Sequence, residues 1–160
     1  MHKFEELQER MGSGSARLIP VQGDLREKLL GVDDATREEL RGKIKHFCHF
    51  AAIYDIGASA EAQNATNIVG TRNAIALAND LQAGCFEHVS SIAAGGMYQG
   101  TFREDMFEEA ENLEHPYFST KHDSEGIVRN AVSYTHLRAH ETSDDISYAV
   151  FCLKRGGGGG

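Results

Sequence analysis

A tyrosine and a lysine lie four residues apart in the segment HPYFSTKHDSE, residues 115–125. Pro116 favours the first turn of a helix, so Tyr117 and Lys121 are predicted to share one helix face. A neighbouring ammonium group stabilises a phenolate and lowers the pKa of a tyrosine from its usual value of about 10. Such a tyrosine can exchange a proton with a carbonyl group while a cofactor transfers hydride. The same spacing also arises by chance on a solvated helix face, which is the alternative interpretation.

Other small and polar residues come near the ends of predicted strands. Ser90 and Ser91 belong to a strand predicted over residues 85–94, and Asp24 and the segment 50–52 follow two earlier apolar runs. Open α/β sheets bind ligands at the carboxyl ends of their strands. A serine there could hold a substrate oxygen, and Asp24 could accept a hydrogen bond from an adenine amino group. Strand capping and plain packing are the alternatives for each residue taken alone.

The order of the predicted elements determines the expected fold class. Strands are predicted over residues 17–21, 47–53 and 85–94, and helices over residues 4–11, 33–44, 59–81 and from Pro116 onward. A polar connection spans residues 95–115. Strands that alternate with helices are typical of parallel α/β proteins, so the predicted fold class is α/β.

Composition and charge exclude several classes of function. The net charge is −8 without a basic block, so neither nucleic acid nor an anionic membrane is an expected partner. No apolar run is long enough to span a bilayer. The three cysteines, Cys48, Cys85 and Cys152, are odd in number and widely spaced, which indicates no disulfide framework and a reducing cytoplasm. His46, Cys48 and His49 alternate along one predicted strand, so they are not expected to share a metal ion, and no metal site is predicted.

Five segments together resemble the extended short-chain dehydrogenase/reductase family. They are GDL at residues 23–25, HFAA at 49–52, NIVGTRN at 67–73, HVSS at 88–91 and YFSTK at 117–121, in the order in which that family has them. The chain is similar to the NAD-dependent epimerase/dehydratase-like proteins of this family. The segment FREDMFEE before the tyrosine, and Glu125 after it, are most similar to the branch that contains fatty acyl-CoA and thioester reductases.

The resemblance implies a role for each motif residue. Tyr117 is the expected acid/base, Lys121 tunes it and orients a ribose, and Ser91 holds the carbonyl, with Ser90 as the alternative serine. The residues expected at the cofactor are Asp24, Leu25, Ala51, Ala52, Asn67, Ser90, Tyr117 and Lys121. The implied cofactor is NAD or NADP, and the implied substrate is a carbonyl compound, an acyl thioester or a sugar nucleotide. The resemblance is compatible with a homodimer of the parent enzyme. A non-catalytic, dinucleotide-binding regulatory protein of the same fold is the alternative.

The start of the family pattern has no counterpart in this sequence. The family begins with a strand, a GxxGxxG loop, a helix and a second strand, and none of these precedes Phe4. In the strand order 3-2-1-4-5-6, losing the first two strands leaves a gap of roughly 14 Å beside the fourth. We therefore expect residues 1–131 to form a partial Rossmann-type, doubly wound parallel sheet that lacks those strands and the glycine-rich loop. Such a chain is expected to fold poorly, to bind a dinucleotide weakly or not at all, and to be inactive.

Residues 132–160 are expected to lie outside this domain. The stretches VSYTHLRAHET and ISYAVFCLK resemble the two ends of a translated sequencing adapter, and five glycines follow them. We therefore expect a non-native tail, and no role is assigned to its histidines or to Cys152.

Overall fold

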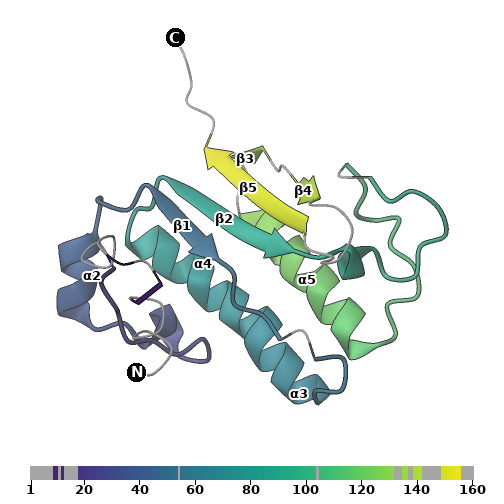
Figure 1. Cartoon of the computed structure of the whole chain (residues 1–160), viewed down its shortest axis with the longest axis horizontal. Helices are drawn as coiled ribbons and strands as arrows, with labels where there is room; N and C mark the ends of the chain where they lie inside the picture. The colour runs from purple at the N-terminus through teal and green to yellow at the C-terminus, as the bar shows by residue number, and fades with distance from the viewer. Residues whose placement is uncertain are drawn as a thin grey trace, which may run out of the picture.

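The computed structural model describes residues 9–10, 12, 18–53, 55–103, 105–131, 135–136, 139–141 and 149–155, with side chains up to residue 131. A small sheet lies over two long helices, which pack against one of its faces (Figure 1). The helical segments are η2 (Lys28–Gly31), α2 (Asp34–Leu40), α3 (Ala60–Gln63), η3 (Asn64–Val69), α4 (Gly70–Asp80), η4 (Ile92–Gly95) and α5 (Pro116–Ala131).

The central pair of strands is parallel. Strand β1 (His46–His49) pairs with β2 (Cys85–Ser90), so that His46 lies opposite Cys85 and His49 opposite His88. The connection between the two strands runs through α3, η3 and α4, which is the helical crossover that parallel strands require. The fold is α/β, as the alternation of elements predicts.

The second edge of β2 is paired by strands from the end of the chain. Strand β5 (Ala149–Arg155) runs antiparallel to β2, and β3 (Thr135–His136) and β4 (Ala139–Glu141) pair with β5 (Figure 1).

The core lies between β1, β2 and the helices α4 and α5. Ala74, Ala78, Phe86 and Val128 form its buried centre. Phe47 stacks on Phe86 with ring centroids 5.5 Å apart. Along β2 every second residue is buried, so its buried face packs against the helices.

Two of the long predicted helices are confirmed. Residues 60–80 are continuously helical, but the segment η3 in the middle has the wider π-helical hydrogen-bonding pattern. Helix α5 begins at Pro116, as its fixed φ favours.

Helix α2 is shorter than predicted, because it ends at Leu40. Its N-cap Asp33 accepts a hydrogen bond from the backbone N–H of Thr36. Gly42 then takes a positive φ of 73° and donates its N–H to the carbonyl of Leu81, which ends the helix before the predicted residue 44.

The predicted strands were too long, and one of them is absent. Residues 18–24 form no regular element, because no described strand lies beside them to satisfy a ladder of hydrogen bonds. Residues 50–53 leave the sheet, and the N–H of Ile53 bonds to the Asn67 side chain instead. After Ser91 the chain turns into η4, where the N–H of Ala94 bonds to the carbonyl of Ser91. The predicted helix over residues 4–11 lies almost wholly outside the described residues.

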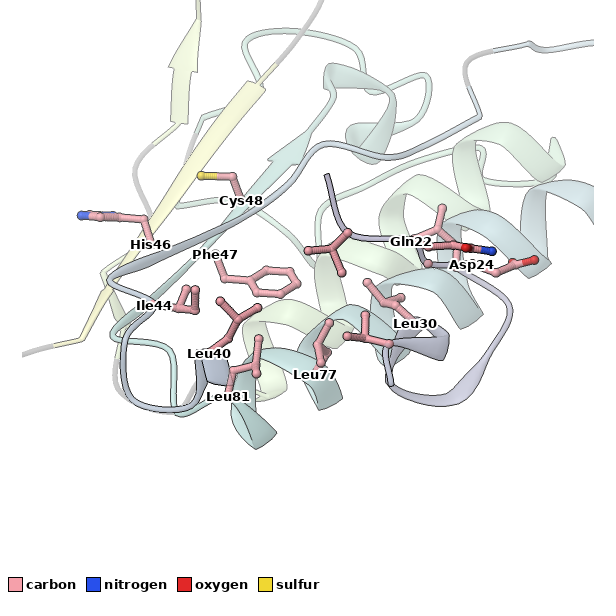
Figure 2. A pocket seen from close by; sticks show the side chains of 14 residues that line it. Gln22, Asp24, Leu30, Leu40, Ile44, His46, Phe47, Cys48, Leu77 and Leu81 are labelled. Atoms are coloured by element: carbon pink, nitrogen blue, oxygen red, sulfur yellow. The ribbon is translucent and has the colours of Figure 1, made fainter. Parts of the chain in front are cut away.

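A cavity of about 460 Å³ lies between the segment 21–25 and β1 (Figure 2). Most of its lining is apolar, and this lining includes Leu30, Leu40, Phe47, Leu77 and Leu81. The sequence predicts a gap at this place, where a complete doubly wound sheet would hold further strands.

No helix in the described part of the chain is long and apolar enough to cross a membrane.

Candidate functional site

Helix α5 carries the tyrosine and lysine of the candidate site. Tyr117 is half-buried in the first turn, and its backbone N–H donates to Nδ1 of His115 at 3.2 Å. Lys121 follows one turn later and is 1% exposed. Residues four apart on a helix share a face, so the two side chains leave α5 from the same side.

Lys121 lies close to the buried histidines of both strands. Burial lowers the pKa of its ammonium from 10.5 to about 8, against the opposing effect of the Glu125 carboxylate. Burial also lowers the pKa of His49 to about 4, and the charge of Lys121 adds to that effect. The pKa of His88 is lowered well below its usual value by burial, by His49 and by Lys121. The charge of Lys121 therefore acts on one buried histidine of each strand.

The two candidate serines have different surroundings. Ser90 is fully buried, and its Oγ donates to Oε2 of Glu125 at 2.7 Å. The other oxygen of Glu125 accepts from Nε of Arg129 at 2.7 Å. Ser91 is 5% exposed, and its Oγ accepts from the N–H of Ala93 at 3.2 Å, at the start of η4. Ser90 therefore contributes to the packing of α5 on β2, while Ser91 stands where the strand ends.

The helical crossover links these elements through its polar side chains. Oδ1 of Asn67 accepts from the N–H of Ile53 at 3.0 Å, and Nδ2 donates to Oγ1 of Thr120 at 3.2 Å. Four residues along, Oγ1 of Thr71 lies 3.1 Å from Nε2 of His49. Asn67 thereby joins the segment after β1 to the helix that carries Tyr117 and Lys121.

The same crossover holds the loop of residues 23–25. Nδ2 of Asn73 donates to the carbonyl of Leu25 at 2.8 Å. A Cβ on Gly70 would lie 3.2 Å from Cβ of Leu25, so the glycine allows a close approach between helix and loop. The motif NIVGTRN is therefore the structural connection between the other motifs.

Asp24 is presented at the edge of the cavity. Its carboxylate accepts from Nε of Arg26 at 3.0 Å and from Nη2 at 2.6 Å. These hydrogen bonds lower the pKa of Asp24 to about 2. Because each carboxylate oxygen has two acceptor positions, the group can still accept a further donor. Ala51 is exposed and Ala52 half-buried, directly after β1.

Sequence reasoning missed the buried histidine pair. The rings of His49 and His88 stack with centroids 5.4 Å apart. Within the described part of the chain, neither ring nitrogen of His88 has a hydrogen-bond partner, although the side chain is 3% exposed. The period of two along β2 places His88 on the buried face with Phe86 and could have indicated it. The carboxylate of Glu125 also belongs to this site, and its spacing of four from Lys121 was the available signal.

The described residues fit the adenine and the ribose of a dinucleotide better than they fit its pyrophosphate. Asp24 and Leu25 offer an acceptor and an apolar surface for an adenine, and the small side chains of Ala51 and Ala52 leave room for a ribose after β1. In residues 18–53, 55–103 and 105–131, no glycine-rich loop leads into a helix N-terminus that could hold the pyrophosphate. The described residues therefore fit part of a dinucleotide and offer no cradle for its pyrophosphate.

Comparisons with known proteins identify the family and the fold. The model of the NAD-binding family described as male sterility protein matches residues 2–140. A search of curated proteins found no match. The crystal structure of the terminal R domain from the myxalamid PKS-NRPS biosynthetic pathway is similar, with a TM-score of 0.67 and 27% identity over 76% of this chain. This chain spans 32% of the length of that structure. The fold is that of an extended short-chain dehydrogenase/reductase of the thioester reductase-like branch, and the chain belongs to the NAD-binding family of the male sterility protein.

Proposed function

We propose that this chain carries the proton-transfer centre of an NAD(P)-dependent reductase that acts on an acyl thioester or another carbonyl compound. The observation that carries the proposal is the position of Lys121, which is buried beside β1 and β2 one turn after Tyr117. A buried ammonium next to a half-buried phenol stabilises the negative charge that forms when the phenol gives up its proton.

Each residue has one step in this proposal. Tyr117 donates its phenolic proton to the substrate oxygen, and Lys121 stabilises the phenolate that remains. Ser91 donates a hydrogen bond to the same oxygen and holds it toward the tyrosine. The dinucleotide, when bound, supplies the hydride. Ser90 is the weaker candidate for this role, because its hydroxyl already donates to Glu125.

Two further groups act as positioning residues in the proposal. Asn67 fixes α5 relative to the segment after β1 through Thr120 and Ile53. Glu125, held by Ser90 and Arg129, keeps the middle of α5 against the end of β2. A shift of about 1 Å at the tyrosine is enough to lower a rate by about 10²-fold, so both anchors matter for the reaction.

The proposed substrate class is inferred from the thioester reductase-like branch of the family and not from a binding pocket. The segment FREDMFEE and the likeness to the R domain favour an acyl thioester over a sugar nucleotide. We propose weak dinucleotide binding and no turnover for the isolated 160-residue chain, because no described loop offers backbone donors to the pyrophosphate.

Substitution in a longer protein that contains this segment tests the function. Tyr117→Phe is expected to lower turnover by orders of magnitude, with dinucleotide affinity nearly unchanged, because only the transferable proton is lost. Tyr98→Phe is the matched control, since Tyr98 packs edge-on against Phe102 and lies outside the proposed centre. Equal turnover in wild-type and Tyr117→Phe protein would remove the tyrosine from the mechanism.

A further inference from the structure

We propose that His46, Cys48, Cys85 and Glu87 form a zinc-binding site on the face of the β1–β2 sheet that points away from the helices. The site uses none of the residues placed in the proton-transfer centre. The zinc site can therefore be tested independently of the proposed reductase activity.

The register of the two parallel strands brings the four side chains together. His46 lies opposite Cys85, and Cys48 lies opposite Glu87. Since side chains two apart on a strand share a face, all four positions lie on one face of the pair. The alternate residue Phe47 belongs to the opposite face, which packs on the helices. In Figure 2, His46 and Cys48 extend away from the ring of Phe47.

Three of the four donors lie close together, and the fourth, Cys48, contacts one of the three. Donor atoms of His46, Cys85 and Glu87 all lie within 4.8 Å of one another. Nδ1 of His46 is 2.6 Å from Oε1 of Glu87, and Sγ of Cys48 is 3.6 Å from Oε2 of the same carboxylate. In a tetrahedral zinc site the bond lengths of about 2.0–2.3 Å set the donors roughly 3.3–3.8 Å apart.

The chemistry of the donors selects the metal. Two thiols, an imidazole and a carboxylate are the ligand types that zinc binds in proteins, and four of them complete a closed tetrahedral shell. Magnesium and calcium prefer oxygen ligands and larger coordination numbers, so a site with one carboxylate suits them poorly.

The proposed ion links two strands that are far apart in the sequence. Cys48 and Cys85 are separated by the whole helical crossover, so a bound ion would fix β1 to β2 directly. A ligand that binds only the folded state raises its stability, and zinc should therefore stabilise this sheet. His49 is buried on the opposite face of β1 and is not part of the set. The remaining ligands come from the neighbouring strand, which no pattern within β1 could indicate.

Cobalt titration of the 160-residue chain tests the site, because Co²⁺ replaces zinc and reports thiolate ligands by absorption. All proteins carry Cys152→Ser, so that Cys48 and Cys85 are the only thiols. We expect one equivalent of Co²⁺ to bind with thiolate-to-metal charge-transfer bands and tetrahedral ligand-field bands. We also expect Zn²⁺ to displace it and to raise the midpoint of thermal unfolding, whereas Mg²⁺ does neither.

Four single variants identify the ligands. His46→Ala, Cys48→Ser, Cys85→Ser and Glu87→Gln are each expected to weaken Zn²⁺ binding in calorimetry by about 100-fold or more, since even outer-shell partners cost 10–100-fold. His115→Ala is the matched control and should leave the affinity unchanged, because His115 is an exposed imidazole at the start of α5. Circular dichroism of each metal-free variant shows whether a loss of binding is only a loss of fold.

Several outcomes overturn the proposal. One is a chain that takes up no Co²⁺ with thiolate bands. Another is a zinc affinity that changes as much in His115→Ala as in the ligand variants. A third is a chain that is unfolded without metal and gains no structure when zinc is added.

Discussion

In a longer protein that contains this segment, replacing Lys121 by methionine is expected to stabilise the fold at neutral pH while removing the proposed activity. Burial lowers the pKa of Lys121 from 10.5 to about 8. One pKa unit corresponds to about 1.4 kcal/mol, so at neutral pH the charged, buried lysine costs the folded state about 3 kcal/mol. Methionine keeps most of the length of the side chain and carries no charge. Glu125 retains its bonds to Ser90 and Arg129, so the substitution leaves no isolated buried carboxylate.

The sign of the pH dependence follows from proton binding. Between pH 8 and 10.5 the unfolded chain holds the proton on Lys121 and the folded chain has released it. Stability therefore rises with pH across this window, and the cost is present in full below pH 8. In Lys121→Met this rise should be absent, and the free energy of unfolding at pH 7 should increase by up to about 3 kcal/mol.

Urea denaturation followed by circular dichroism at pH 7, 8, 9 and 10 measures both effects. Lys43→Met is the matched control, because Lys43 is exposed and its removal should leave the pH dependence as it is. If Lys121→Met and wild-type protein gain the same free energy between pH 8 and 10, the lysine is not a buried charge. Lys121 would then not be buried beside β1 and β2.

Three further predictions concern the other anchors, the glycines and the two serines. Asn67→Ala should lower the free energy of unfolding by about 1–3 kcal/mol in urea denaturation, because it removes the hydrogen bonds that join the crossover to Ile53 and to Thr120. Gly96→Ala should destabilise more than Gly42→Ala in thermal unfolding. Both glycines have positive φ, but a Cβ on Gly96 would clash with the backbone carbonyl oxygen of Glu111, whereas Gly42 faces open space. Equal midpoints would contradict this contact. Ser91→Ala should lower turnover of the longer enzyme with little change in stability. Ser90→Ala should mainly lower stability, and the reverse pattern would exchange their assignments.

Local patterns predicted the helices and the placement of the motifs. The start of α5 follows from Pro116, and the shared face of Tyr117 and Lys121 follows from a spacing of four. Both depend only on neighbouring residues. The family of the chain was also predicted from the order of its short motifs, and the match over residues 2–140 confirms it.

Features that depend on distant partners could not be predicted in this way. An apolar run becomes a strand only beside another strand, so residues 18–24 remain irregular despite their composition. The bond between Ser90 and Glu125 and the stacking of His49 on His88 each join separate elements. Their residue types were visible in the sequence, but their pairing required the packing of α5 against the sheet.

Because of the π-helical segment η3, the contacts that the crossover helix makes depend on its number of residues. Each residue of an α-helix turns the chain by about 100°, and the wider π turns absorb extra residues without breaking the helix. Asn67 lies inside this segment, while Thr71 and Asn73 lie beyond it in α4. Deleting a single residue from η3 would rotate the part of the helix before the deletion relative to α4. The two parts could then no longer contact their hydrogen-bond partners at the same time. The number of residues in η3 should therefore be kept together with the motif. In natural variants, substitutions within η3 should be more common than deletions.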